Sequence, residues 1–408
     1  MKPLGPIPNG FAAVDGELAI DGVPVSELVE RAGGTPLFVY SSSMIRNRVA
    51  RLRAAMPAKL AIHYAVKANP FPPVLQLLSE LVDGFDIASG GELAIVRETG
   101  IDPALVSFAG PGKRDSELGA AISAGVTLNL ESEGEAERAL TIAGKLGIVP
   151  RLAIRVNPEF DLKGSGMKMG GGAKPFGLDA ERVPALAGRI LASGANWRGF
   201  HIFAGSQALD AAAIAETQAQ SVELAAQLAR SSGAALPHCN LGGGFGIPYF
   251  PGDRALDIAE VGARLGERLA DLTGELADTK FCIELGRYLV GEAGVYLTRI
   301  VDRKVSHAET FLIVDGGLHH QLAASGNFGT VVRRNYPSAI ATRFDVAVEE
   351  EASIVGCLCT PLDILANRAG FPKAEVGDIA AIFCAGAYGA TASPAQFLGQ
   401  GPAREMLV

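Results

Sequence analysis

Short apolar segments alternate with amphipathic segments eight times in this 408-residue chain, and this alternation constrains the fold more than any other feature. The strand-like segments begin near Leu60, Phe85, Val106, Thr127, Arg151, Trp197, His238 and Lys280. The Ala/Leu-rich segments between them have helical period, most clearly at 73–82, 91–99, 115–124, 133–146, 211–231 and 255–278. Eight strand–helix repeats predict an α/β fold, a (β/α)8 TIM barrel, with a doubly wound open sheet as the alternative.

A second domain is indicated by a change in pattern after Glu284. Apolar and β-branched runs without a long helix between them occur at 288–301, 310–316, 351–358 and 379–387. Residues 11–30 predict a β-hairpin and a short helix, and a lone hairpin needs further strand partners. We therefore expect a barrel over 34–286 and an all-β, sandwich-like or barrel-like domain made of 1–33 and 287–408.

Charge and cysteine content narrow the class of protein. The net charge is −8 and no basic block occurs, so neither nucleic acid nor an anionic membrane is an expected partner. Five cysteines, some in apolar runs, argue against a disulfide framework and for a reducing compartment. Cys357 and Cys359 form a C-x-C pair without a second pair, so no metal site is expected. With no signal-like N-terminus and no long apolar run, we expect a cytoplasmic protein.

Functional side chains fall where the predicted barrel strands end. Lys67 ends the first strand, in apolar surroundings that lower the pKa of a lysine and suit a Schiff-base nucleophile. A lysine whose ammonium reaches water is the alternative. Glu284 ends the eighth strand and can pair with a pyridine nitrogen or simply with Arg287. The rest of this set is Asp86, His201, Ser206, Gly242, Gly243, Gly244 and Gly286.

Barrel enzymes have their sites at this rim, and the set suits pyridoxal 5'-phosphate (PLP). The lysine would hold the aldehyde as an imine, the carboxylate would keep the ring protonated, and glycine N–H groups would approach the phosphate. His201 either stacks on the ring or is a hydrogen-bonded core residue. In the second domain, Cys359 is either a proton donor or an inert thiol. Tyr388, in a glycine turn, can bring its hydroxyl to a phosphate.

Together these blocks resemble the fold-type III PLP-dependent decarboxylases, the diaminopimelate and ornithine decarboxylase family. The matching blocks are 63–69, 85–93, 201–207, 241–246, 284–287, Cys359 with Asp363, and 386–388. The resemblance implies an amino-acid decarboxylase, EC 4.1.1.-, built as a TIM barrel with a β domain. It also implies a head-to-tail homodimer in which Cys359 enters the barrel of the partner.

The same resemblance implies a role for each residue. Lys67 forms the internal aldimine, and Cys359 reprotonates the quinonoid left when CO2 departs. Glu284 pairs with the ring nitrogen, and His201 stacks on the ring. The remaining cofactor-binding residues are Asp86, Ser206, Gly242, Gly243, Gly244, Gly286, Arg287 and Tyr388. The implied substrate-binding residues are Arg287, Cys359, Thr360, Asp363 and Tyr388.

Two departures from the family concern the substrate. Thr360 stands where diaminopimelate decarboxylases carry an acidic residue. Their Arg-Pro-Ala-Leu-Tyr block, which binds a substrate carboxylate, is replaced by the segment that contains His319 and His320. Adjacent histidines do not face one way, so we predict a solvated turn or a position near the pocket, not a chelate.

These departures predict a substrate other than free diaminopimelate. The Cys-Thr-Pro-Leu-Asp segment resembles a biosynthetic-cluster branch of the family. That branch includes decarboxylases of carrier-bound aminoacyl groups and decarboxylases encoded beside exopolysaccharide and exosortase genes. Two alternatives remain, a PLP-dependent racemase and a non-catalytic PLP-binding protein. Glu284 argues against the racemase, because racemases of this fold use an arginine at the ring nitrogen.

Overall fold

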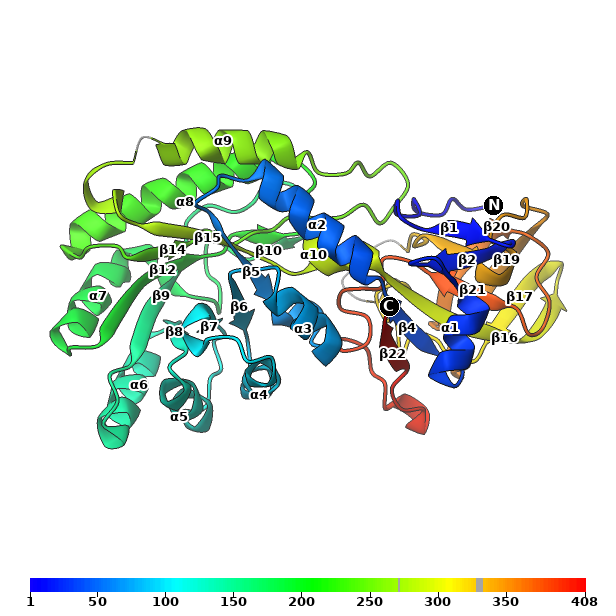
Figure 1. The fold of residues 1–408 in the computed structure, drawn as a ribbon, viewed down its shortest axis with the longest axis horizontal. Helices are drawn as coiled ribbons and strands as arrows, with labels where there is room; N and C mark the ends of the chain where they lie inside the picture. The colour runs from blue at the N-terminus through cyan, green and yellow to red at the C-terminus, as the bar shows by residue number, and fades with distance from the viewer. Residues whose placement is uncertain (271, 328–332) are drawn as a thin grey trace. The chain divides into compact units, whose positions relative to one another are not determined.

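The computed structural model of the chain describes residues 1–270, 272–327 and 333–408. The chain divides into two compact units, which we describe separately (Figure 1). The barrel unit consists of 49–247 and 255–286. The β unit consists of 1–48, 248–254 and 287–408.

Eight parallel strands of the barrel unit close on themselves. They pair in the order β5-β6-β7-β8-β9-β12-β14-β15, and β15 returns to β5. Their bounds are β5 Ala61–Ala65, β6 Gly84–Ile87, β7 Val106–Phe108, β8 Thr127–Leu130, β9 Arg151–Asn157, β12 Asn196–Ile202, β14 His238–Asn240 and β15 Lys280–Leu285. The predicted TIM barrel is confirmed, and the open sheet is excluded because β8 and β9 also pair.

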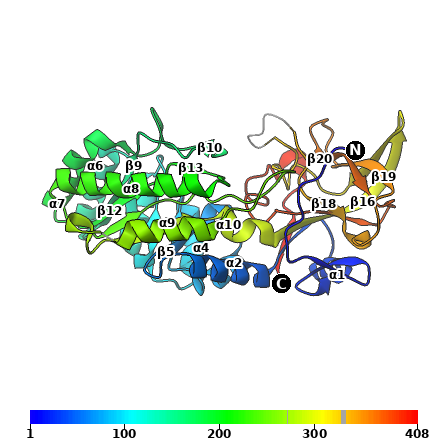
Figure 2. The same ribbon diagram turned by 90° about the horizontal axis from the view of Figure 1, so that it is seen from above.

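Helices lie outside the strands, as Figure 1 shows for α3 to α6. Their bounds are α2 Ser42–Ala55, α3 Pro72–Ser79, α4 Gly90–Glu98, α5 Asp115–Ala124, α6 Glu133–Leu146, α7 Val183–Ala192, α8 Ala211–Ser232 and α9 Ile258–Ala270. The long helices α8 and α9 run side by side (Figure 2). Local sequence explains the helix ends: Ser132 accepts the N–H of Glu135 at the start of α6, and Gly147 ends it with φ 67°. Within the described residues, no helix combines the length and apolarity needed to cross a membrane.

Short strands complete the barrel unit at its rim. β11 (Leu178–Asp179) adds in parallel to β9, and β10 (Met167–Lys168) pairs with β13 (Gly205–Ser206). The β10–β13 pair joins the glycine-rich loop after β9 to the segment that follows β12.

The β unit is built on an eight-stranded sheet and a small hairpin sheet. The path β18-β21-β16-β17-β19-β20 is joined by β4, which pairs with β16 and β22. The bounds are β4 Leu37–Tyr40, β16 Gly294–Ser306, β17 Glu309–Val314, β18 Ser338–Ile340, β19 Glu350–Val355, β20 Ile364–Phe371, β21 Ile379–Ile382 and β22 Arg404–Leu407, with the short helix α10 at Arg287–Val290. The predicted boundary at residue 34 lies just before β4, whose four apolar residues resemble a barrel strand in sequence.

The N-terminal segment shares the core of the β unit. It forms β1 (Ala12–Val14), β2 (Glu17–Ile20), β3 (Val23–Pro24) and α1 (Val25–Ala32). Leu18 and Leu28 are fully buried in one apolar cluster with Val295 of β16 and Phe383. The prediction that this hairpin joins the β domain is confirmed, because its apolar face is buried there.

Candidate active site

Lys67 lies just beyond the carboxyl end of β5, but not in the strand itself. It is the middle residue of a 3-10 turn, Val66–Ala68, and its side chain is exposed while both neighbours are buried. Of the two environments predicted for Lys67, the structure matches the one in which the ammonium reaches water, because the turn directs the side chain out of the apolar layer. The ammonium lies 5.7 Å from the centroid of the Phe203 ring, which follows β12.

Glu284 is buried at the end of β15 and is held by two partners. Nε2 of His201 lies 2.9 Å from Oε2 of Glu284, and the Asn240 side-chain amide donates to the same oxygen at 3.2 Å. Burial by itself raises the pKa of Glu284. The His201 ring, with smaller contributions from Lys67 and Arg155, lowers it, and together these effects exceed that of burial, so the pKa is lowered and the carboxylate stays charged.

The other carboxylate oxygen, Oε1, accepts no hydrogen bond from any described residue. Asn240 was missed from sequence, although a polar residue in the apolar strand before the glycines was a usable signal. The Asn240 Oδ1 accepts the Gly242 N–H at 2.8 Å, so Asn240 links Glu284 to the glycine loop, which we define as Gly242, Gly243 and Gly244.

The glycine loop follows β14 and packs closely against its neighbours. A Cβ on Gly244 (φ 81°) would lie 2.6 Å from the Gly205 carbonyl oxygen, and a Cβ on Gly243 would overlap the Glu284 carbonyl oxygen. Only glycine fits such positions. Within the described residues, the N–H groups of Gly243 and Gly244 donate to no acceptor. The Ser206 hydroxyl, next to Gly205, also has no partner there.

Two further predicted residues flank this group. Gly286 packs against the turn that carries Lys67, since a Cβ there would lie 2.8 Å from the Ala68 Cβ. Asp86, in β6, is buried and is engaged by the side chains of His63 (Nδ1–Oδ2 3.3 Å) and Ser107. The structure thus brings Lys67 and Gly286 to the rim, whereas Asp86 belongs to a polar layer inside the barrel.

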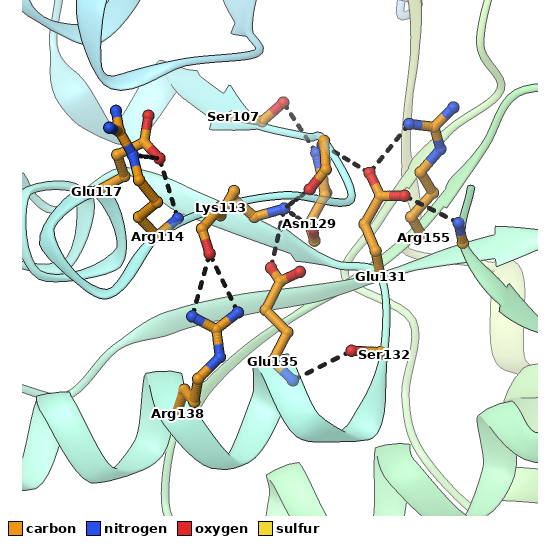
Figure 3. Close-up of polar contacts among 12 residues, drawn as sticks. Ser107, Lys113, Arg114, Glu117, Asn129, Glu131, Ser132, Glu135, Arg138 and Arg155 are labelled. Carbon is orange, nitrogen blue, oxygen red and sulfur yellow. Dashed lines mark hydrogen bonds and ion pairs between the residues drawn. The ribbon is translucent and has the colours of Figure 1, made fainter. Parts of the chain in front are cut away.

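A charged network beyond β8 and β9 was also missed (Figure 3). Arg155 of β9 is buried and donates to Oε1 of Glu131 at 3.0 Å. Beside this pair, the Lys113 ammonium contacts Glu135 Oε1 at 2.8 Å and donates to two backbone carbonyls. Arg155 helps to lower the pKa of Glu284, so the network contributes to the charge of the site. None of its residues lies in a motif from which the site was predicted.

The remaining predicted residues belong to the β unit. Arg287 donates to the Tyr249 hydroxyl at 2.6 Å, and its guanidinium lies 4.8 Å from the centroid of the Tyr388 ring. The buried Arg287 Nε has no hydrogen-bond partner among the described residues. Tyr388 has φ 58°, a strained conformation for a residue with a side chain, which is typical of functional sites. Arg287 and Tyr388 thus form one aromatic–cationic cluster.

Cys359, Thr360 and Asp363 lie in one loop between β19 and β20. The Cys359 thiol is exposed. The buried Asp363 accepts the N–H of Leu318 at 2.6 Å and that of Leu358 at 3.0 Å, one on each oxygen. This geometry favours a role for Asp363 in shaping the Cys359 loop over direct contact with substrate.

The histidine pair is not a solvated turn. His319 and His320 are 0% and 5% exposed, with ring centroids 3.9 Å apart. Burial, and then His319, lower the pKa of His320 to about 4. Its Nδ1 lies 3.0 Å from the Tyr296 hydroxyl and its Nε2 lies 2.9 Å from the Gly401 carbonyl oxygen, partners that suit a neutral ring. The solvated-turn alternative is wrong because these partners are distant in sequence, whereas the alternative of a position near the pocket stays a prediction.

Comparison with known proteins agrees with the geometry of the rim. Residues 42–291 match the family described as "Pyridoxal-dependent decarboxylase, pyridoxal binding domain". An L-glutamyl-(BtrI acyl-carrier protein) decarboxylase from Niallia circulans is 34% identical over 95% of this chain and 92% of that protein. A diaminopimelate decarboxylase from Aquifex aeolicus is 35% identical over 92% of this chain and 87% of that protein.

The solved structures extend the likeness to the whole fold. The diaminopimelate decarboxylase of M. jannaschii in complex with L-lysine superposes with a TM-score of 0.86 at 26% identity, covering 98% of this chain and 93% of that chain. The match covers barrel and β domain alike. The chain therefore belongs to the family of pyridoxal-dependent decarboxylases, and it is a carboxy-lyase that uses PLP.

Proposed function

We propose that this protein removes the α-carboxylate of an amino acid at the barrel rim. The observation that carries the proposal is the environment of Glu284, a buried, charged carboxylate with one oxygen free of hydrogen bonds. An acceptor of this kind fits the protonated nitrogen of a pyridine ring. The unpaired N–H groups of Gly243 and Gly244 fit the phosphate of the same cofactor.

The residues of the chain would then divide the work. Bound PLP supplies an electron sink for the pair of electrons left on Cα. Lys67 binds its aldehyde, Glu284 keeps its ring nitrogen protonated, and His201 contacts the ring. Ser206 and the glycine loop bind the phosphate, and Arg287 and Tyr388 add a cation and a hydroxyl. Asp86 and Gly286 support this group from the interior and from the Lys67 turn.

We also propose that Cys359 returns a proton to Cα and that it does so across a homodimer interface. An exposed thiol is suited to proton transfer when a second surface covers it. Asp363 holds the loop by its two backbone contacts, which would orient Cys359 and Thr360 toward a substrate.

The proposed substrate is an amino-acid group carried by a protein, such as a glutamyl group attached through its side-chain carboxyl so that the α-carboxylate stays free, rather than free diaminopimelate. Thr360 cannot attract a distal ammonium as an acidic residue does. The buried pair His319 and His320 offers no fixed cation for a second carboxylate, because burial lowers the pKa of both rings. The similarity to the Niallia circulans enzyme, whose name specifies a carrier-bound glutamyl group, supports this choice.

The test is CO2 release by the PLP-loaded protein from a substrate panel. The panel contains meso-diaminopimelate, L-lysine, L-glutamate and L-glutamyl acyl-carrier protein. We expect kcat/KM for the carrier-bound group to exceed that for diaminopimelate at least about 10-fold. A factor of this size corresponds to the loss of one hydrogen bond to a charged group. A preference for diaminopimelate would reject the substrate, and racemisation without CO2 release would reject the reaction.

A further inference from the structure

A cavity opens into the barrel at the end opposite to the glycine loop. Its volume is about 440 Å³, within the range of small-molecule sites. Its lining includes the first residues of several strands, among them Ala61 of β5, Arg151 of β9 and Lys280 of β15. Since all barrel strands are parallel, their first residues share one end and the rim residues share the other. We call this space the floor cavity.

Three cations line the floor cavity, and none has a carboxylate partner. They are Arg151, Arg198 and Lys280, and no ion pair joins them to an acidic side chain anywhere in the described ranges. The cavity is also lined by Asp83, but that carboxylate is already paired with Arg53 at 2.6 Å. The three cations therefore face the cavity without an ion-pair partner among the described residues.

The cations also lie close to one another. The half-buried Arg198 contacts Nε2 of His238, which accepts from the guanidinium and must then be neutral. Burial, followed by Arg198 and Lys280, lowers the pKa of His238 to about 4. Burial and then Arg151 lower the pKa of Arg198. Like charges held together beside a cavity destabilise the fold unless an anion compensates them.

The inner wall does not provide that anion. Asp86 is engaged by His63 and Ser107, as described above. The rest of the wall offers amide and hydroxyl groups from Asn129 and Thr127 and apolar surface from Phe200.

We propose that the floor cavity binds a small organic anion. Its acidic group, a phosphate or a carboxylate, is held by Arg151, Arg198 and Lys280, and its apolar part contacts Phe200. Guanidinium groups suit both acids, because each can receive two parallel hydrogen bonds. The proposal does not depend on the decarboxylation proposed above, since none of the three cations is a rim residue, although Asn240, which donates to Glu284, also lines the cavity.

The test is calorimetry on the PLP-loaded protein, in which the rim phosphate site is occupied. The probes are inorganic phosphate, a sugar phosphate and succinate, each at matched ionic strength. We expect saturable binding of one molecule per chain for at least one probe, and the comparison of probes identifies the acid. Arg198→Gln should lower the affinity at least about 10-fold. The matched control is Arg264→Gln, an exposed arginine of α9 paired with Glu260, which should leave affinity unchanged.

Lys280→Gln removes a second cation, at the exposed first residue of β15. It replaces Arg198→Gln as the test variant if Arg198→Gln does not fold. Absence of saturable binding for all three probes would overturn the proposal. Binding of equal strength in wild type and in the Arg198 or Lys280 variants would also overturn it. CO2 release measured in parallel separates the two proposals, because neither cavity variant touches the rim.

Discussion

His201 and Glu284 meet inside the barrel, with Nε2 of the ring 2.9 Å from Oε2 of the carboxylate. The pair keeps Glu284 charged although its side chain is buried. Glu284→Gln removes that charge while preserving shape, so we expect turnover to fall about 100-fold or more, as for other buried groups that stabilise reacting charge. CO2 release measures the loss. Glu275→Gln, at an exposed position, should behave as wild type, and wild-type turnover in Glu284→Gln would refute the role.

Lys67 is exposed on its turn, which suits a group that must reach a carbonyl. Lys67→Ala should abolish both the visible absorbance of the bound cofactor and turnover, because no other described residue is proposed to bind its aldehyde. Lys59→Ala is the matched control, since Lys59 is exposed just before β5. Retention of the absorbance in Lys67→Ala would contradict the assignment.

The proposed interface is tested by mixing inactive subunits. If Cys359 serves the partner's barrel, Lys67→Ala and Cys359→Ala subunits should together recover up to about a quarter of wild-type activity, because half the dimers are mixed and each has one intact site. Cys357→Ala is the control, because Cys357 is also an exposed thiol, two residues away, and the Cys357→Ala protein should stay active alone. No recovery on mixing would argue for sites complete within one chain.

Lys113 and Glu135 form an ion pair in which both side chains are almost fully buried, 1% and 2% exposed. Lys113→Met leaves the carboxylate buried without its cation, so the free energy of unfolding should fall by about 3–5 kcal/mol. Chemical denaturation measures this change. Combining Lys113→Met with Glu135→Leu should restore most of the stability. The control is Lys145→Met, because Lys145 is exposed on α6, the helix that carries Glu135, and its replacement should have little effect. A double variant no more stable than Lys113→Met would show that the charge is not the cause.

His320 predicts a pH dependence of stability. Its pKa is about 4 in the folded protein and 6.5 in an unfolded chain, so the unfolded state binds more protons between these values. The contribution of His320 to the free energy of unfolding is complete above pH 6.5. It is lost as the pH falls toward 4, and the total loss is about 3 kcal/mol. Unfolding free energies measured across this window should slope less in His320→Gln. The exposed His307→Gln should keep the wild-type slope, and an unchanged slope in His320→Gln would exclude the effect.

Sequence alone was enough to locate the barrel. The eight strands lie where apolar runs begin, and helices α5 and α6 have the predicted bounds, because periodicity and capping residues act over a few neighbours. The place of the rim motifs at the ends of the strands could also be predicted from sequence, since each motif follows its strand directly. The glycine loop is an example, as three successive glycines after β14 signal close backbone approach.

Tertiary structure decided the features that depend on distant partners. β4 belongs to the sheet of the β unit because β16 and β22 pair with it, although its own residues resemble a barrel strand. His320 is neutral and buried because Tyr296 and Gly401 supply its hydrogen bonds. Lys67 is exposed because a turn, not the apolar pattern around it, sets its direction. A sequence reports local preference, whereas burial and pairing are set by contacts between segments that the linear order does not bring together.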